Sequence, residues 1–183
     1  MYRSNPRQAS SSLLHERGVR NAALVAKLHR RGSLIVPLSG HCMEPLLFAG
    51  DYAVIQQPIA LEVGHLFLVV QESGELALHR LVALYERSLL FKGDVTGSFE
   101  CRRAESVIGR LVGIQFRDGG EIVPWHYSWF EMNVLVAISR SLIVHEGDVN
   151  PICGKSRWRL FRGIVRIWGR RRRRIMVDSA FSG

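Results

Sequence analysis

The chain has 183 residues, with 25 Lys and Arg against 16 Asp and Glu, and a formal net charge of +9. Because 47% of the residues are hydrophobic, the chain can bury a core, which excludes wholesale disorder. No apolar run approaches the roughly 20 residues that span a bilayer. The Ser- and Arg-rich start also lacks the apolar block of a secretory signal peptide.

The three cysteines, Cys42, Cys101 and Cys153, are an odd count with no paired spacing. This pattern speaks against a disulfide framework, and the absence of a CxxC motif or a Cys/His ligand pair speaks against zinc. We therefore expect neither a metal nor another cofactor. Free thiols survive in the reducing cytoplasm, so we expect a cytoplasmic protein, at the inner face of the membrane if the basic tail binds there.

The positive charge lies at the two ends of the chain. Residues 1–31 carry +6, residues 32–150 carry −6 and residues 151–183 carry +9. A basic protein suggests nucleic-acid binding, but here the basic residues are confined to the ends and the body is acidic. We predict four segments: a basic N-terminal helical segment at 1–31, a β-rich domain at 32–126, an apolar helix at 127–150 and a basic amphipathic tail at 151–183.

The N-terminal segment divides into a polar start and a short helix. Met1 to Ser12 are polar, and we expect them to be mobile. From Leu13 to His29 the apolar residues recur at helical spacing and predict a helix that ends near Gly32. This segment is too short to be a complete helix-turn-helix domain.

The pattern then changes to short β-type runs separated by turn residues. Many short strands at close spacing predict a mainly β fold, an antiparallel and partly open barrel-like domain. Asp118-Gly119-Gly120 is typical of a tight hairpin turn. The expected strands are Leu34–Leu38, Tyr52–Gln57, Leu66–Gln71, Leu76–Leu84, Ser88–Lys92, Val107–Phe116 and Glu121–Trp125.

Two helical patterns follow the strands. Ser128 and Glu131 fit a capping box, which predicts an apolar helix to about His145 that docks on the β domain or on a partner. From Ser156 to Ile175, large apolar side chains share one helical face and arginines another. Such a helix suits the headgroup boundary of an anionic membrane, with packing on its own domain or nucleic-acid binding as alternatives. The apolar face comprises Trp158, Phe161, Ile164, Val165 and Trp168, and the cationic face Arg159, Arg162, Arg166, Arg170 and Arg173.

The stretch from Val36 to Asp51 carries the most informative chemistry. Gly40 permits an unusual backbone angle just before Cys42, and Pro45 limits the conformation after it. A thiol presented on such a loop is a candidate nucleophile. The alternative is that Cys42 is a small buried hydrophobe, which is the usual role of a lone cysteine beside Met and Leu.

Gly40-His41-Cys42-Met43-Glu44-Pro45, followed by Gly50-Asp51, resembles the Gly-x-Ser-Met-x-Pro…Gly-Asp signature of the signal peptidase I and LexA-type self-cleaving repressor superfamily. Similar stretches follow in the family's order, and together they cover roughly residues 34–116. They are Val63–Val70, similar to the Gly-Asp-hydrophobic strand; Leu78–Val82, similar to the His-Arg-Val-Val stretch of the archaeal and endoplasmic-reticulum type signal peptidases; Phe91–Asp94, similar to their Lys-Gly-Asp segment; and Val107–Val112, similar to their closing strand.

The resemblance implies a peptidase domain that hydrolyses a peptide bond. It places Cys42 at the position of the serine nucleophile and His79 at that of the general base. Asp94 falls near the acid that supports the histidine in the His-type members. The family also holds its substrate as an extended strand along an exposed sheet edge, with backbone amides stabilising the oxyanion. On this basis the substrate-binding candidates are Gly40, His41, Met43 and Arg80, with Arg80 anchoring either its own strand or a substrate carbonyl.

The chain departs from the family pattern in three places. Cys42 replaces the serine, His65 replaces the aspartate of the Gly-Asp strand, and residues 1–31 contain no apolar membrane anchor. Cysteine and histidine are nevertheless a matched nucleophile and base. A nearby imidazolium can lower a thiol pKa from about 8.5 to as low as ~3.5, and we expect this at Cys42.

Two functional hypotheses follow. The first is a peptidase that acts on a peptide or protein substrate through Cys42 and His79, held at the membrane or at an acidic partner by its basic tail. The second is a catalytically inactive member of the same fold that serves as a binding module for nucleic acid or membrane.

Overall fold

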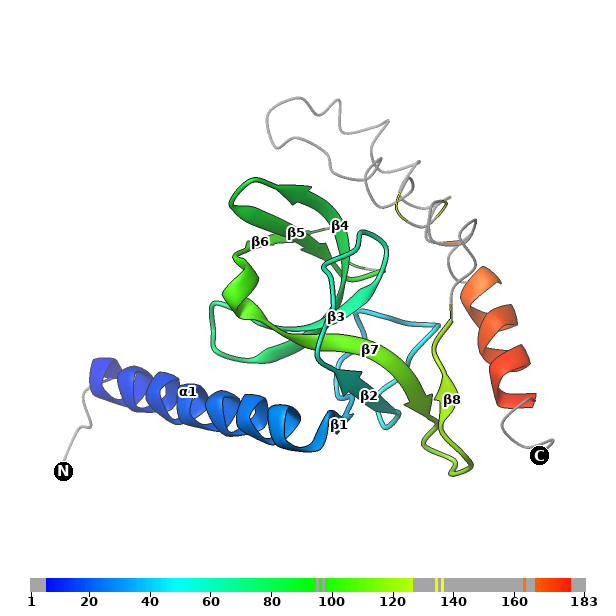
Figure 1. The fold of residues 1–183 in the computed structure, drawn as a ribbon, viewed down its shortest axis with the longest axis horizontal. Coiled ribbons are helices and arrows are strands. Elements are labelled where there is room, and N and C mark those ends of the chain that lie inside the picture. Colours follow the sequence, from blue (N-terminus) through cyan, green and yellow to red (C-terminus); the bar gives the residue numbers. More distant parts are fainter. Residues whose placement is uncertain are drawn as a thin grey trace.

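The computed structural model describes residues 6–94, 96, 98–126, 134, 136, 163 and 167–178. Eight strands form one sheet in the order β1-β2-β7-β3-β4-β5-β6, with β8 added to β7 (Figure 1). Every pairing is antiparallel, and β1 and β6 end the path, so the sheet is open. The predicted mainly β fold is confirmed. The strands are β1 (Ser33–Pro37), β2 (Tyr52–Gln56), β3 (Leu66–Val70), β4 (Leu76–Tyr85), β5 (Ser88–Lys92), β6 (Phe99–Arg102), β7 (Val107–Gln115) and β8 (Val123–Pro124).

Strand β3 shows why the sheet can bury two cores. Successive side chains of a strand point to opposite faces. Leu66 and Leu68 therefore enter the main core, whereas Phe67 and Val69 enter a second cluster on the other face. Because both faces are covered, β3 is apolar throughout, which made it easy to predict from the sequence.

Most strand predictions are confirmed within one residue at each end. Two differ more. β8 is only two residues long, Val123–Pro124, where Glu121–Trp125 was expected. β6 was not predicted, because it is only four residues long and two of the four are charged. It forms by pairing with β5, a tertiary interaction that overrides local preference.

The N-terminal helix α1 runs over Pro6–Arg31. It ends at Gly32, whose φ of 73° is the left-handed conformation that commonly terminates a helix. The helix begins at Pro6, seven residues before the predicted start at Leu13, so residues 6–12 of the polar start are helical. Pro6 is tolerated at a first helical position, because its missing N–H would have no helical partner there. Leu28 is buried in the main core, and Asn21 Nδ2 donates to Gly74 O at 3.0 Å. The helix is therefore attached to the β body.

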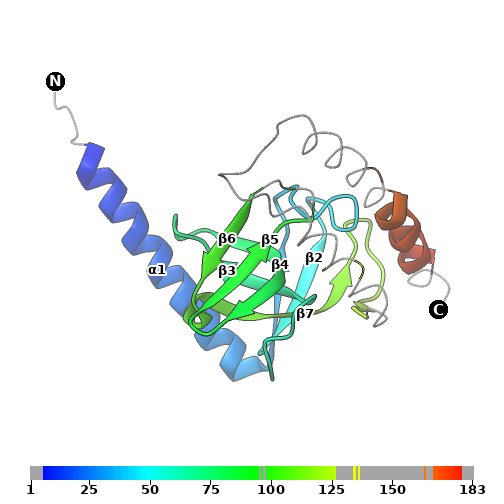
Figure 2. The same cartoon turned by 90° about the horizontal axis from the view of Figure 1, so that it is seen from above.

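Residues 167–178 form a second helix, on the side of the molecule away from α1 (Figures 1 and 2). Met176 is buried in the main core, and Trp168 and Val177 pack against it. In the described part of the tail, the alternative of a basic helix packed on its own domain is thus what the structure shows. The other predicted face residues (Trp158, Arg159, Phe161, Arg162, Ile164, Val165 and Arg166) lie outside the described residues.

The predicted helix between the β domain and the tail is described only at Val134 and Val136, both helical. Its capping residues, Ser128 and Glu131, lie outside the described residues. Among the residues that are described, no helix is both long and apolar enough to cross a membrane.

Candidate active site

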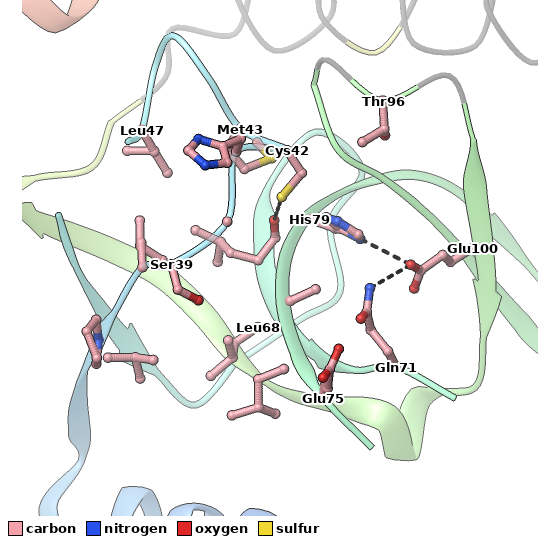
Figure 3. A pocket seen from close by; sticks show the side chains of 18 of the residues that line it. Ser39, Cys42, Met43, Leu47, Leu68, Gln71, Glu75, His79, Thr96 and Glu100 are labelled. Atoms are coloured by element: carbon pink, nitrogen blue, oxygen red, sulfur yellow. Dashed lines mark hydrogen bonds and ion pairs between the residues drawn. The ribbon is translucent and has the colours of Figure 1, made fainter. Parts of the chain in front are cut away.

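A cavity of about 770 Å³ brings the predicted nucleophile and base together. Cys42, from the loop after β1, and His79, from β4, both line it; in Figure 3 the Cys42 sulfur points toward the Leu78 carbonyl and the His79 ring toward Glu100. Three predicted substrate contacts, Gly40, His41 and Met43, line it as well. α1 also contributes, through Arg20 and Leu24, which no sequence pattern indicated.

The loop that carries Cys42 (residues 38–51) is closed at its base and folded tightly at its centre. Leu38 and Asp51 are joined by a backbone hydrogen bond of 2.8 Å, and Gly50 N donates to Leu38 O at 2.8 Å. Gly50 has a φ of 94°, which favours glycine, so the predicted Gly50-Asp51 turn is confirmed. Met43, Leu46 and Leu47 are buried in the main core, and their burial holds the loop against the sheet.

Two glycines of the site have opposite surroundings. A Cβ on Gly93 would lie 2.8 Å from Cys42 Cβ and 3.0 Å from Cys42 O, so only glycine lets the end of β5 approach the nucleophile this closely. Gly40 has no positive φ, and nothing lies within 4 Å of a Cβ placed there. The expectation of an unusual backbone angle at Gly40 is therefore wrong. Its lack of a side chain leaves open space in the cavity instead.

The Cys42 thiol is protonated at neutral pH. Its S–H faces Leu78 O at 3.7 Å. Burial, followed by the negative charges of Asp94 and Glu100, raises the pKa of Cys42 to about 11, although its own backbone N–H acts in the opposite direction. The expected thiolate, with a pKa lowered by an imidazolium, is thus wrong for this resting state. The protein supplies desolvation and negative charge around the sulfur, and both disfavour the anion.

His79 is 6% exposed, and burial lowers its pKa below the ordinary value despite the opposing negative charges of Glu100 and Asp94. The imidazole is therefore neutral at neutral pH. Its Nδ1 makes no hydrogen bond within the described residues, and Glu100 Oε1 lies 4.0 Å from it (Figure 3). The site at rest consists of a neutral thiol and a neutral base.

Glu100, on β6, is the carboxylate that faces the histidine. Gln71 Nε2 donates to its Oε1 at 2.8 Å, and Arg102 donates to its Oε2 at 3.2 Å. Glu100 is not recognised from the sequence as a site residue, because its strand β6 is not recognised either. The available signal was the pair Glu100 and Arg102, whose spacing of two places both side chains on the same face of a strand.

Asp94 and Arg80 lie behind the cavity and do not line it. Arg80 is fully buried; it donates to Asp94 through Nε at 2.8 Å and through one terminal nitrogen at 2.6 Å, and to Gly64 O at 2.6 Å. Of the two roles expected for Arg80, the structure fits the anchor of a strand and not the contact to a substrate carbonyl, because the side chain is fully buried and does not line the cavity. Asp94 acts on His79 through its charge alone. Lys92 is buried on the same side, and burial lowers its pKa to about 8.

The remaining candidates lie at the margins of the site. His41 is exposed on the rim of the cavity, with Nδ1 bonded to Glu44 Oε1, and Met43 forms part of the buried wall. His65 pairs with Glu62 at 2.9 Å outside the cavity. Cys101 is exposed, and Cys153 lies outside the described residues. In the part of the chain that the structure describes, no three His, Cys, Asp or Glu side chains gather as a metal site would require.

Comparison with models of known protein families finds no match, and comparison with curated proteins finds no significant relative.

Proposed function

We propose that this protein is a cysteine-type peptidase, with Cys42 as the nucleophile, His79 as the general base and Glu100 as the carboxylate that supports the histidine. One observation carries the proposal. Cys42 and His79 line the same cavity, and the thiol faces the carbonyl of Leu78, the residue directly before the base. Two side chains that the family motifs place 37 positions apart in the sequence thus face a single space large enough for a peptide.

The neutral resting pair defines the order of proton transfers. His79 accepts the thiol proton as the Cys42 sulfur attacks the carbonyl carbon of the scissile bond. The C–N bond then breaks, and the imidazolium returns the proton to the leaving amine. Water hydrolyses the thioester with His79 again as base, which regenerates the thiol and releases the acid. Glu100 stabilises the imidazolium in both halves.

The substrate in this proposal is an extended peptide. β1 lies at the end of the sheet, and residues 35–39, at the end of this strand and just after it, line the cavity together with residues 75–79 of β4 and the turn before it. A chain segment laid between them would meet backbone groups on both sides, as in β-strand addition. We further propose that the open sheet is the partly open barrel of the LexA and signal peptidase type, with cleavage at the cytoplasmic face of the membrane.

The test is a digestion of a proteome-derived peptide library by the full chain, with cleavage sites read by mass spectrometry. We expect cleavage to be abolished by Cys42→Ala and by His79→Ala. Cys101→Ala and His65→Ala are matched controls, since both residues lie outside the cavity, and should cleave like the wild type. Equal cleavage by all four variants would show that no Cys42–His79 dyad operates.

The second candidate, a binding module without catalysis, is favoured by the outer face of the C-terminal helix. Ile167 and Ile175 are 73% and 60% exposed, and Arg170, Arg171 and Arg174 are exposed beside them. Apolar and cationic side chains on one face suit an anionic lipid surface. Sedimentation with phosphatidylserine vesicles tests this: a triple Arg→Ser variant should lose binding, and binding that persists would argue against this surface. Duplex DNA serves as the competing ligand.

A further inference from the structure

Arg173 was predicted to lie on the cationic face of the tail, but its side chain packs into the protein. Its two terminal nitrogens donate to Asp51 Oδ2 at 2.5 Å and to Oδ1 at 3.0 Å. The guanidinium also lies between the rings of Phe48 and Phe116, 4.6 and 4.7 Å from their centroids. The Arg173 side chain is 14% exposed. An arginine held by a bidentate ion pair and two aromatic faces is not a solvated residue of a charge run.

Asp51 gives this contact its importance. It is fully buried, and its carboxylate also accepts hydrogen bonds from Phe48 N at 2.8 Å and Arg117 N at 3.2 Å. A buried carboxylate requires a paired charge, and Arg173 supplies it. Asp51 ends the loop that carries Cys42, so the C-terminal helix completes the anchor of that loop.

A second contact ties the same helix to the middle of the loop. A Cβ on Gly169 would lie 2.9 Å from Pro45 Cγ and 3.4 Å from Leu46 N. Arg173 also reaches Leu46 O at 3.5 Å. The helix therefore touches the loop at Pro45 and Leu46, three and four residues after Cys42, as well as at Asp51.

We propose that Arg173 is a positioning residue for Cys42: through Asp51, Pro45 and Leu46, the helix of residues 167–178 holds the Cys42 loop in its buried, cavity-facing conformation. The helix lies outside the stretch that resembles the peptidase family. Its effect on catalysis rests on the proposed function, whereas its effect on the accessibility of the thiol does not.

The experiment measures alkylation of Cys42 by iodoacetamide in the full-length protein, with the label located by mass spectrometry. Arg173→Met removes the clamp and keeps a side chain of similar length. Arg174→Met is the matched control, because Arg174 is the exposed neighbour on the same helix. We expect alkylation of Cys42 to accelerate about threefold or more in Arg173→Met, since release of the loop opens the site locally. Arg174→Met should react like the wild type, and near-ultraviolet circular dichroism should show both variants folded.

Alkylation of Cys42 at the wild-type rate in folded Arg173→Met would overturn the proposal. If Arg173→Met does not fold, Arg173→Lys keeps the charge and loses the bidentate geometry. Hydrogen exchange of the amides of residues 43–51 then gives the answer: faster exchange confined to this segment supports the clamp, and unchanged exchange overturns it.

A kinetic measurement separates this proposal from the proposed function. If the chain is a peptidase, Arg173→Met should lower kcat more than it raises KM, because the nucleophile rather than the substrate groove is displaced. If no peptidase activity exists in the wild type, the proposed function fails while the alkylation result still decides the role of Arg173.

Discussion

Two aspartates near Cys42 each accept two hydrogen bonds from a single arginine, yet the two pairs are built differently. Arg80 and Asp94 are 14 residues apart on neighbouring segments, and neither side chain is more than 3% exposed. Arg173 and Asp51 are 122 residues apart, and the arginine comes from the C-terminal helix of residues 167–178. The Arg80–Asp94 pair lies on the side of the site that carries His79, and the Arg173–Asp51 pair lies at the end of the Cys42 loop.

The comparison shows how the two walls of the cavity are held in place: one is the loop that carries Cys42, and the other is formed by β4, with His79, and the end of β5. Asp94 directly follows Gly93, which touches Cys42, and Asp51 ends the Cys42 loop. Each wall thus ends in a buried carboxylate neutralised by an arginine. Arg80 and Asp94 lie 14 residues apart on β4 and just after β5, whereas the pair of Arg173 and Asp51 requires the C-terminal helix to be docked. His79 therefore lies beside an ion pair formed within the β domain, and the Cys42 loop depends in addition on a contact with the C-terminal helix.

The largest expected effect comes from breaking the inner pair. Arg80→Met leaves Asp94 buried without its partner, and we expect a loss of about 3–5 kcal/mol in the free energy of unfolding, measured with guanidinium chloride. Arg110→Met is the control, because Arg110 pairs with Glu62 at 3.3 Å on the surface and its loss should cost at most about 1 kcal/mol. Similar losses in both variants would contradict the structural role of the inner pair.

The contact between the two walls can be tested at glycine. Gly93→Ala places a Cβ 2.8 Å from Cys42 Cβ, and we expect it to destabilise the fold by about 1–3 kcal/mol. Gly40→Ala meets open space and should change the free energy of unfolding by no more than about 0.5 kcal/mol. Thermal unfolding of the two variants provides the measurement. A larger loss of stability in Gly40→Ala than in Gly93→Ala would contradict the close contact between Gly93 and Cys42.

Glu100 is a third carboxylate of the site, and it differs from Asp51 and Asp94 in that it faces His79 directly. Glu100→Gln should lower kcat/KM about tenfold to a hundredfold, or about 1.4–2.7 kcal/mol in activation free energy. The charge of Glu100 raises the pKa of His79, so its removal lowers that pKa further. The acid limb of the pH–rate profile, already below the ordinary histidine pKa of 6.5, should therefore move to still lower pH.

The control for this variant is Glu72→Gln, because Glu72 pairs with Arg102 but is 88% exposed. Its pH–rate profile should match that of the wild type. An acid limb that stays in place in Glu100→Gln would remove Glu100 from the mechanism.

The smallest expected effect is the coupling free energy between the Arg80–Asp94 and Arg173–Asp51 pairs. We compare Arg80→Lys, Arg173→Lys and the double variant in urea unfolding, since lysine keeps the charge but loses the bidentate geometry. Because Gly93 and Cys42 are in contact, we expect a coupling energy of about 0.5 kcal/mol or more. Losses that add to within about 0.3 kcal/mol would show that the two walls respond independently.

How far the sequence predicts this molecule depends on the range of the interactions. β3 is recognised because each of its residues is apolar, and the Gly50-Asp51 turn because its backbone conformation favours glycine. β6 is not recognised, since only pairing with β5 makes Phe-Glu-Cys-Arg a strand. The start of α1 is missed because its first residues are polar, so the apolar helical spacing begins only at Leu13 although the helix begins at Pro6.

The candidate site divides in the same way. The mainly β class, the acidic body between basic ends and the motif order that singles out Cys42 and His79 can all be read from the residues alone. Folding alone sets three features of the site: Glu100 rather than Asp94 faces His79, Arg80 is buried out of reach of the cavity, and Arg173 pairs with the end of the Cys42 loop. It also decided the protonation of the thiol, because burial and the distances between charges set a pKa and both arise only on folding.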